Sequence, residues 1–448
     1  MIVMKFGGSS VANADRIRHM AEIVKARIDR RPIVVLSAMG DTTDHLLDAG
    51  DAALNHGVVS LEKVEAPHLK TIADLGLNEK ASNDIQALLS ELRTLLTGIS
   101  LIRELSGRTK DYLVSFGERL SVRIAAAYFA SLGIKAVALD AWDGGFLSNS
   151  NFTFAELAPE SWKLIPAKLL PPAEEGVLQL VTGFIAKDEK GNITTLGRGG
   201  SDLSATMIAA ACGAEEVQVW KDVDGILTAD PRVVPNARPV EIASYEVASE
   251  LAHFGAQVLH PRAMQPCMKT GTPVLVKNSY NPEAPGTRIV PALCKEARHV
   301  QVITSRKKET LVDIVSLRML GQHGFLAEVF SWFAKHSLSV DMIATSEVSV
   351  SLTLGSNYDL SELEKDLSKI ASVEIKTGKA IVTIIGDVRR SSKILAHAFS
   401  VCESLGVQVQ MISQGASKVN ISFIVEDHEA DKVVQALHED FFEKEGAE

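Results

Sequence analysis

Short apolar segments alternate with amphipathic ones along the first two thirds of the chain. Residues 2–6 are apolar and end at two glycines, and residues 15–28 then carry apolar side chains at helical spacing. The segment PIVVLSAMG, residues 32–40, returns to the pattern of a buried strand. Strand, helix and strand in this order predict a βαβ unit with parallel strands.

The alternation continues to about residue 280. Residues 60–135 are predicted to be mainly helical, with a strong amphipathic helix at 117–132. Further strands are predicted at 135–140, 177–183, 216–220 and 272–278, and an alanine-rich helix at 201–213. This repetition predicts a three-layer αβα domain with a mostly parallel central sheet over residues 1–285.

An internal repeat follows a turn-rich segment, NSYNPEAPGT, at 278–287. The stretch that begins at residue 312 aligns with the stretch that begins at 382, so that Phe330 matches Phe399. Each copy has the pattern of a ferredoxin-like βαββαβ module. We therefore expect a linker and joining strand at 286–310, one module at 311–378 and a second at 379–448.

Composition narrows the class of protein. The chain has 448 residues and a net charge of -10, which argues against a nucleic-acid or membrane partner and requires a local basic site for any anionic ligand. No secretion signal and no apolar run close to the length of a spanning helix are apparent, so we expect a cytoplasmic protein. Four cysteines without metal or disulfide spacing are expected to be free thiols.

The first candidate site is KFGGSSV, where Lys5 at the end of a strand meets Gly7, Gly8 and Ser9. Glycines let backbone N–H groups approach a phosphate, and Lys5 could reach phosphate oxygens as a point charge. The spacing differs from that of a P-loop, so a simple strand-to-helix turn stays open at this point.

TLGRGGSDLSA, residues 195–205, is the second candidate site. Its glycines can form a nest of backbone donors around Arg198, whose guanidinium suits a carboxylate or a phosphate. Asp202 falls in the first turn of the following helix, where it could be a structural residue or could hold Lys5.

Two further segments carry candidate residues. WKDVDGILTADPR places Asp222 after a strand, where open α/β sheets bind ligands, although a plain polar loop has the same pattern. SFGERLS places Glu118 at a predicted helix start, where it could be structural or could bind a substrate ammonium. The histidines have no ligand spacing, and no metal site is predicted.

These segments together resemble one family. KFGGSSV, SFGERLS, GFI at 183–185, TLGRGGSDLSA, WKDVDGILTADPR, SELAHFGAQVLHP and PVLVKN occur in the order found in aspartokinases of the amino-acid-kinase superfamily. The repeated modules resemble the ACT domains that follow the kinase domain there. The resemblance covers nearly the whole chain. It implies ATP-dependent phosphorylation of the β-carboxylate of L-aspartate with Mg²⁺, which is the first step towards lysine, threonine and methionine.

The resemblance also implies roles for individual residues. Lys5 would stabilise charge on the transferred phosphoryl group, and Asp202 would orient Lys5. Glu118 would bind the aspartate ammonium and Arg198 its α-carboxylate, with Ser37, Gly199 and Ser201 beside them. The residues implied around the nucleotide are Gly7, Gly8, Ser9, Lys221, Asp222, Asp230, Arg232 and Gln257.

The first repeat resembles the lysine-sensitive members of the family, in which the effector binds where ACT units pair across a dimer. L-lysine is therefore the implied effector, and a homodimer or a dimer of dimers is the implied assembly. No dehydrogenase segment follows, so a monofunctional enzyme is expected. The implied effector-binding residues are Met319, Gly324, Phe325, Leu326, Ser339, Val340, Asp341, Thr345, Ser346 and Glu347.

Two positions depart from the family pattern. Gln257 stands where a lysine is common, and Lys221 could supply part of the missing charge. Gly321 stands where lysine-sensitive relatives often carry a hydrogen-bonding side chain, which puts the effector in question. Two alternatives stay open: a non-catalytic amino-acid sensor, and a kinase of the same superfamily with another acidic substrate.

Overall fold

Contacts divide the chain into two units. The computed structural model describes residues 1–253, 259–291, 299–319, 323–355, 358–388, 391–414 and 419–444. The first unit comprises Met1–Ile226, Glu241–Tyr245 and Val258–Leu293, and the second comprises Leu227–Val240, Glu246–Gln257 and Cys294–Glu448. The division therefore differs from the expected boundary at residue 285, because two earlier segments group with the C-terminal part.

An eight-stranded sheet forms the centre of the first unit. All neighbouring strands are parallel except β10 and β11, so the prediction of a mostly parallel sheet is confirmed. Strands β1 and β2 are buried along their whole length, which explains their continuous apolar sequences. The order is β3 (Ala136–Leu139), β5 (Leu178–Thr182), β2 (Ile33–Leu36), β1 (Val3–Phe6), β8 (Val217–Lys221), β10 (Val274–Asn278), β11 (Thr287–Val290) and β9 (Ile242–Ser244).

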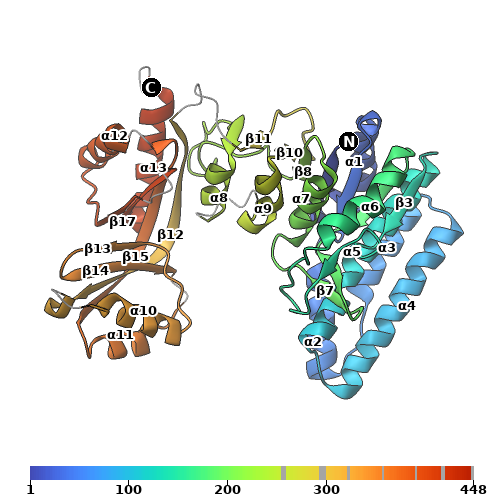
Figure 1. Ribbon diagram of the computed structural model, residues 1–448, viewed down its shortest axis with the longest axis horizontal. Coiled ribbons are helices and arrows are strands. Elements are labelled where there is room, and N and C mark those ends of the chain that lie inside the picture. The colour runs from blue at the N-terminus through green and yellow to red at the C-terminus, as the bar shows by residue number, and fades with distance from the viewer. Residues whose placement is uncertain are drawn as a thin grey trace. The chain divides into compact units, whose positions relative to one another are not determined.

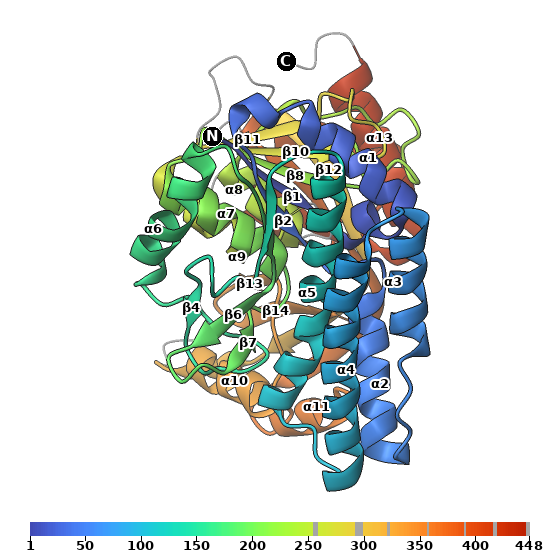
Figure 2. The ribbon, with the colours of Figure 1, turned by 90° about the vertical axis from the view of Figure 1, so that its right-hand side faces the viewer.

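Helices cover both faces of this sheet, which confirms the three-layer prediction (Figures 1 and 2). One side carries α1 (Ala14–Lys25), α2 (Thr42–His56), α3 (Glu62–Asp74), α4 (Glu79–Ile102) and α5 (Gly107–Ser131). The other side carries α6 (Ser161–Glu174), α7 (Gly200–Cys212) and α9 (Pro261–Thr270), while α8 (Tyr245–His253) follows β9.

Helix α5 begins ten residues before the predicted helix at 117–132. The side chain of Ser106 caps it by accepting a hydrogen bond from the amide of Thr109. Glu118 therefore lies in the middle of a long buried helix, and its predicted place at a helix start is wrong. The helix dipole consequently contributes little to the energy of the Glu118 carboxylate, because that effect is confined to the terminal turns.

Helix α4 is long and apolar enough to cross a membrane by length and composition alone, which the sequence reading had not anticipated. It packs against α2 and α5, and its face formed by Leu88, Leu92, Leu96 and Ile99 belongs to the main core of the first unit. This packing accounts for the apolar residues on that face of the helix.

A small second sheet was not predicted from the sequence. It consists of β4 (Leu147–Ser148), β6 (Ile185–Asp188) and β7 (Ile193–Thr195), with β6 and β7 antiparallel. Strands this short leave little periodicity to detect. The sheet matters because β7 leads directly into the glycine-rich segment 196–202.

The second unit contains one six-stranded sheet in the order β13-β14-β12-β15-β17-β16. Helices α10 (Phe325–Lys335) and α11 (Ser361–Leu367) pack in one core, and α12 (Ser391–Ser404) and α13 (Ala430–His438) pack in another. The strands are β12 (Val300–Val315), β13 (Ile343–Thr345), β14 (Ser349–Gly355), β15 (Ser372–Gly386), β16 (Met411–Ser413) and β17 (Asn420–Glu426).

The long strands β12 and β15 each serve both ferredoxin-like modules. Residues 309–315 of β12 lie between β14 and the first part of β15, whereas residues 300–306 pair with the second part of β15. The second module thus receives its edge strand from residues that precede the first module. Residues 300–306, expected to be a linker and joining strand, are part of the second module's sheet.

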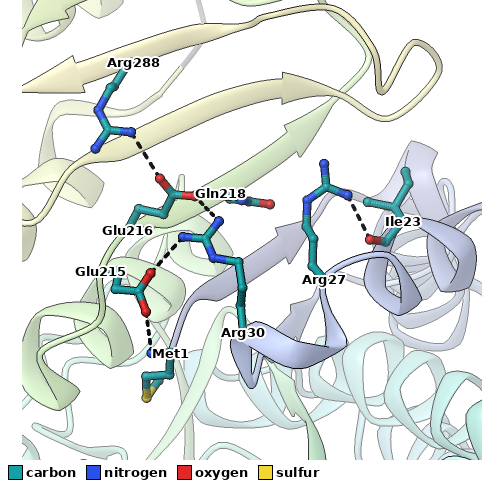
Figure 3. Close-up of polar contacts among 8 residues, drawn as sticks. All are labelled: Met1, Ile23, Arg27, Arg30, Glu215, Glu216, Gln218 and Arg288. Atoms are coloured by element: carbon teal, nitrogen blue, oxygen red, sulfur yellow. Dashed lines mark hydrogen bonds and ion pairs between the residues drawn. The ribbon is translucent and has the colours of Figure 1, made fainter.

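A cluster of charged side chains ties together the amino-terminal ends of the central strands (Figure 3). Glu216 accepts hydrogen bonds from Arg30 at 2.9 Å, Gln218 at 2.8 Å and Arg288 at 3.2 Å. Its neighbour Glu215 is exposed and binds Arg30 at 3.0 Å. Burial alone would raise the pKa of Glu216, but the hydrogen bonds from Gln218 and Arg30 outweigh this and lower it.

We expect Glu216→Ala to lower the free energy of unfolding by about 2–3 kcal/mol, because it removes a buried acceptor with three partners. Glu215→Ala is the matched control and should cost clearly less, because exposed ion pairs contribute little to stability. Since the native pKa of Glu216 is the lower one, its contribution is complete above the ordinary value of 4.5 and is lost as the pH falls below it. Urea unfolding of both variants at neutral and acidic pH tests this, and equal losses would contradict it.

Candidate active site

A cavity of about 460 Å³ lies in the first unit, where the carboxyl ends of β1 and β2 meet the start of α7. Ligands of open α/β sheets bind at such ends. Eight residues that the sequence singled out line it: Lys5, Gly8, Ser37, Glu118, Arg198, Gly199, Ser201 and Asp202. The structure thus brings together segments that are far apart in the sequence.

Lys5 and Asp202 form a buried ion pair in this cavity. The Nζ of Lys5 lies 2.7 Å from Oδ1 of Asp202, and the Nζ of Lys221 lies 3.5 Å from Oδ2. Burial would raise the pKa of Asp202, but the two lysines more than compensate and hold it below its ordinary value. The carboxylate is therefore ionised at neutral pH and fixes two ammonium groups at one wall of the cavity.

Glu118 is a buried carboxyl group without a compensating cation in contact. Its Oε1 accepts a hydrogen bond from the amide of Ala38 at 3.2 Å, and its Oε2 is buried with no hydrogen-bond partner. Burial raises its pKa to about 8, against the smaller opposing effects of the Ala38 amide and Lys5. An unpartnered buried acceptor that lines a cavity is suited to a ligand that donates hydrogen bonds or carries positive charge.

The segment 196–202 has the geometry that its glycines predict. Gly197 and Gly199 have φ angles of +73° and +74°, and a side chain on Gly199 would collide with His260. Gly183 allows Ser201 to approach closely, since a Cβ there would lie 2.7 Å from the Cβ of Ser201. Arg198, held between these glycines, lines the cavity and is exposed.

Two side chains that were not predicted from the sequence hold the segment around Arg198 in place. Arg262 donates hydrogen bonds of 2.6 Å to the carbonyl oxygens of Leu196 and Ala155. Asp111, two turns before Glu118 on α5, accepts from the amide and the hydroxyl of Thr195 at 2.9 Å and 2.7 Å. These hydrogen bonds join residues that are far apart in the sequence, so no local sequence pattern predicts them.

The first glycine loop approaches the backbone of a neighbouring loop. A Cβ on Gly8 would lie 2.9 Å from the carbonyl oxygens of Ala38 and Gly40, so only glycine fits there. Gly7 follows β1 and donates its N–H to the carbonyl of Trp220 at 3.3 Å. Ser9 continues the loop in the short helical turn Gly8–Val11. Gly7 and Ser9 are next to the cavity wall in sequence but do not line it.

The other residues implied around a nucleotide are placed differently. Asp222 is exposed just after β8, one residue beyond Lys221. Asp230 and Arg232 bind each other, with 2.6 Å between Oδ2 and Nη2, and both fall in the second unit. The hydrogen bonds from Arg232 lower the pKa of Asp230. Gln257 and Gly321 lie outside the described residues.

The residues implied in effector binding lie on the first ferredoxin-like module. Gly324 has a φ of +91° and precedes α10, whose first residue, Phe325, is buried. Asp341 forms an ion pair of 2.5 Å with Arg306, whereas Glu347 is exposed and forms no ion pair with the residues that the structure describes. Leu326, Ser339, Thr345 and Ser346 are exposed, and Met319 and Val340 are half-buried.

The cavity also contains residues that the sequence reading did not select. Ala38, Gly40 and Thr43 follow β2, and Phe184 follows β5. Their shared signal is position after a strand, which was applied to Asp222 but not to these residues. Within the described ranges, no group of three histidine, cysteine or acidic residues could hold a metal ion.

Comparisons with known proteins show which families the two parts of the chain match. Residues 1–278 match the amino acid kinase family and residues 382–441 match the ACT domain. The chain is 47% identical over 458 residues to aspartokinase 1, chloroplastic, of Arabidopsis thaliana, covering 98% of this chain and 80% of that protein. It is 35% identical over 470 residues to lysine-sensitive aspartokinase 3 of Escherichia coli (strain K12), covering 99% of each.

The fold of the chain is also similar to solved structures. E. coli aspartokinase III in complex with lysine and aspartate (T-state) has a TM-score of 0.84 and 36% identity, covering 99% of this chain and 100% of that chain. The same enzyme in complex with aspartate and ADP (R-state) has a TM-score of 0.80 and 34% identity, with the same coverage.

Proposed function

The chain belongs to the aspartokinase family and phosphorylates aspartate, and from this premise we propose which residues bind the substrate and which stabilise the phosphoryl group. Glu118 binds the α-ammonium of aspartate and Arg198 its α-carboxylate, while Lys5 faces the phosphoryl group in transfer. The proposal rests mainly on the cavity, which brings Glu118, Arg198 and the Lys5–Asp202 pair together. A non-catalytic sensor would have no need of this arrangement.

The aspartate subsite follows from charge complementarity. Glu118 ionises when the ammonium arrives, because the cation replaces the missing partner of its buried Oε2. Arg198 offers a planar fork that suits a carboxylate, and the neighbouring glycines leave room for the substrate backbone. Ser37, Gly199 and Ser201 complete the walls. The β-carboxylate of the substrate is thereby directed towards Lys5.

The phosphoryl step needs no general base, since a carboxylate is already ionised at neutral pH. One β-carboxylate oxygen forms a bond to the γ-phosphorus of ATP, and the bond from that phosphorus to the bridging oxygen breaks. The electron pair leaves with ADP, and the product is 4-phospho-L-aspartate. Lys5 neutralises charge on the transferred group, and Asp202 holds Lys5 in place before the reaction begins.

The nucleotide side of the cavity is assigned to the loop of Gly7, Gly8 and Ser9, with Lys221 and Asp222 at the end of β8. Lys221 shares Asp202 with Lys5 and so brings a second ammonium group to the same wall. We infer that Mg²⁺ would be held mainly by ATP and water and would neutralise phosphate charge there, because Asp202 is already paired with two lysines. Asp230, Arg232 and Gln257 stay proposed nucleotide-binding residues.

Regulation is proposed to reside in the two repeated modules, predicted at 311–378 and 379–448, with residues 300–306 completing the sheet of the second. L-lysine is the proposed effector because the first module resembles lysine-sensitive members of the family and the chain as a whole matches the lysine-sensitive E. coli enzyme. Glu347 is the better candidate for its ammonium, since Asp341 is paired with Arg306. Pairing of these modules in a dimer or a dimer of dimers is part of the proposal. A cytoplasmic location also stays a prediction, which cell fractionation tests.

We expect ADP formation with L-aspartate and ATP, little with L-glutamate, and inhibition by L-lysine. The cavity fixes the distance between the groups that bind the α-substituents and Lys5, so one extra methylene misplaces the attacking oxygen. A coupled assay with each amino acid, repeated with lysine, threonine and methionine, measures this. Equal turnover of glutamate would refute the proposed subsite, and inhibition by threonine alone would refute lysine as effector.

A further inference from the structure

A second cavity, of about 530 Å³, lies in the first unit and shares no lining residue with the active-site cavity. It is bounded by α4, α5 and the β6–β7 hairpin, which lie side by side in Figure 2. Arg119 lines this cavity, and the preceding residue of α5, Glu118, lines the active site. The reaction proposed above uses none of its residues.

Arg119 is a buried cation whose hydrogen-bonding capacity is largely unused. Only 9% of the residue is exposed, and its Nη2 donates one long hydrogen bond of 3.3 Å to Oε2 of Glu91. Its Nε lies 3.8 Å from Oδ2 of Asp140, beyond hydrogen-bond distance, and neither Nε nor Nη1 has a hydrogen-bond partner. A buried guanidinium left in this state is costly, and an additional anion would relieve the cost.

The nearby carboxylates are already committed to other groups. Asp140 forms a two-pronged pair with Arg123, with distances of 2.9 Å and 3.0 Å. Glu91 accepts a hydrogen bond from the hydroxyl of Tyr112 besides that from Arg119. The two acidic groups are thus shared with Arg123 and Tyr112, so Arg119 has no carboxylate to itself.

Two more cations line the same cavity. Arg108 is exposed and has no ion-pair partner among the residues that the structure describes. Lys187 lies over the ring of Trp142, with its Nζ 4.0 Å from the ring centroid. Three cations and the single carboxylate of Glu91 give the walls a net positive charge, in a chain whose net charge is -10. Such a local excess concentrates anions.

We propose that this second cavity binds a small organic anion, whose carboxylate or phosphate group is held by Arg119 and Arg108. Arginine forks suit both oxyanions, and the volume is that of a metabolite-sized ligand. The rings of Tyr112 and Trp142 line the cavity and provide apolar contact for the body of the ligand. The site is distinct from the aspartate and nucleotide subsites.

Isothermal titration calorimetry with phenyl phosphate and with benzoate tests the proposal. Saturating aspartate and ADP occupy the active site during the titration, so that any further heat reports another site. The variants are Arg108→Gln, at an exposed position where misfolding is not expected, and Arg119→Gln. Lys110→Gln is the matched control, since Lys110 is an exposed cation on the same helix that does not line the cavity.

The wild type and Lys110→Gln should bind at least one of the two probes equally well. Arg108→Gln and Arg119→Gln should each weaken binding by about tenfold, the effect of losing one hydrogen bond to a charged group. Binding of phenyl phosphate alone identifies a phosphate ligand, and binding of benzoate alone identifies a carboxylate. Failure of both probes to bind the wild type, or unchanged affinity in Arg108→Gln, would overturn the proposal.

Discussion

Lys5→Ala should fold like the wild type and lose at least about 100-fold in kcat, the effect of removing one preorganised group that stabilises transition-state charge. The fold should survive because Asp202 keeps Lys221 as a partner at 3.5 Å. The KM for aspartate should change much less, since the proposed aspartate-binding groups are Glu118 and Arg198. A coupled ADP-release assay and circular dichroism on the same sample provide the two measurements.

The variant Lys221→Ala is the matched control for Lys5→Ala. It removes the more distant of the two lysines that contact Asp202, and we expect a smaller loss of kcat with a rise in the KM for ATP. Asp202→Ala should lose as much kcat as Lys5→Ala, and the double variant should lose little more, because residues that act as one unit are not additive. The proposed pairing would be contradicted if Lys5→Ala kept the wild-type kcat. It would also be contradicted if the loss of kcat in the double variant equalled the two single losses multiplied together.

Glu118→Gln is expected to raise the KM for aspartate about 10- to 100-fold, the equivalent of a lost charged hydrogen bond. The wild-type kcat/KM for aspartate should also fall as the pH drops below about 8, since the pKa of the buried Glu118 is raised to about 8 in the free enzyme. The direction follows from protonation: neutral Glu118 cannot pair with the substrate ammonium. The variant should lack this pH limb.

Proton release gives a second test of Glu118. At neutral pH the group is mostly protonated in the free enzyme, so binding of aspartate should release close to one proton. Calorimetry in buffers of different ionisation enthalpy measures that number. Glu104→Gln, which changes an exposed glutamate, should keep both the proton release and the pH limb. Their persistence in Glu118→Gln would show that another group titrates.

The active-site residues that could be predicted are those whose immediate sequence neighbours indicate a binding site. A charged residue among glycines, such as Arg198, indicated more than a turn, and Arg198 does line the cavity. Lys5 was also predictable as a candidate, because it stands at the end of an apolar strand and shortly before two glycines that can admit a phosphate. Asp202 fell in the first turn of its helix, as the sequence had indicated.

Other features were not predictable because they depend on pairings between distant segments. Arg262 and Asp111 hold the segment around Arg198 through hydrogen bonds to Leu196 and Thr195, and their own sequence neighbourhoods are ordinary. The start of α5 was missed because its first ten residues mix charged and apolar side chains, which displaced Glu118 from its predicted place.

The sequence by itself determined the layered α/β architecture, the repeat and the charged residues of the loops, because periodicity and glycine placement are local properties. Only the tertiary structure decided that residues 300–306 complete the sheet of the second module, that Glu118 is buried without a cation, and that Arg119 lines a separate cavity. Strand pairing, burial and electrostatic environment arise from contacts between remote residues. They exist only once the chain has folded.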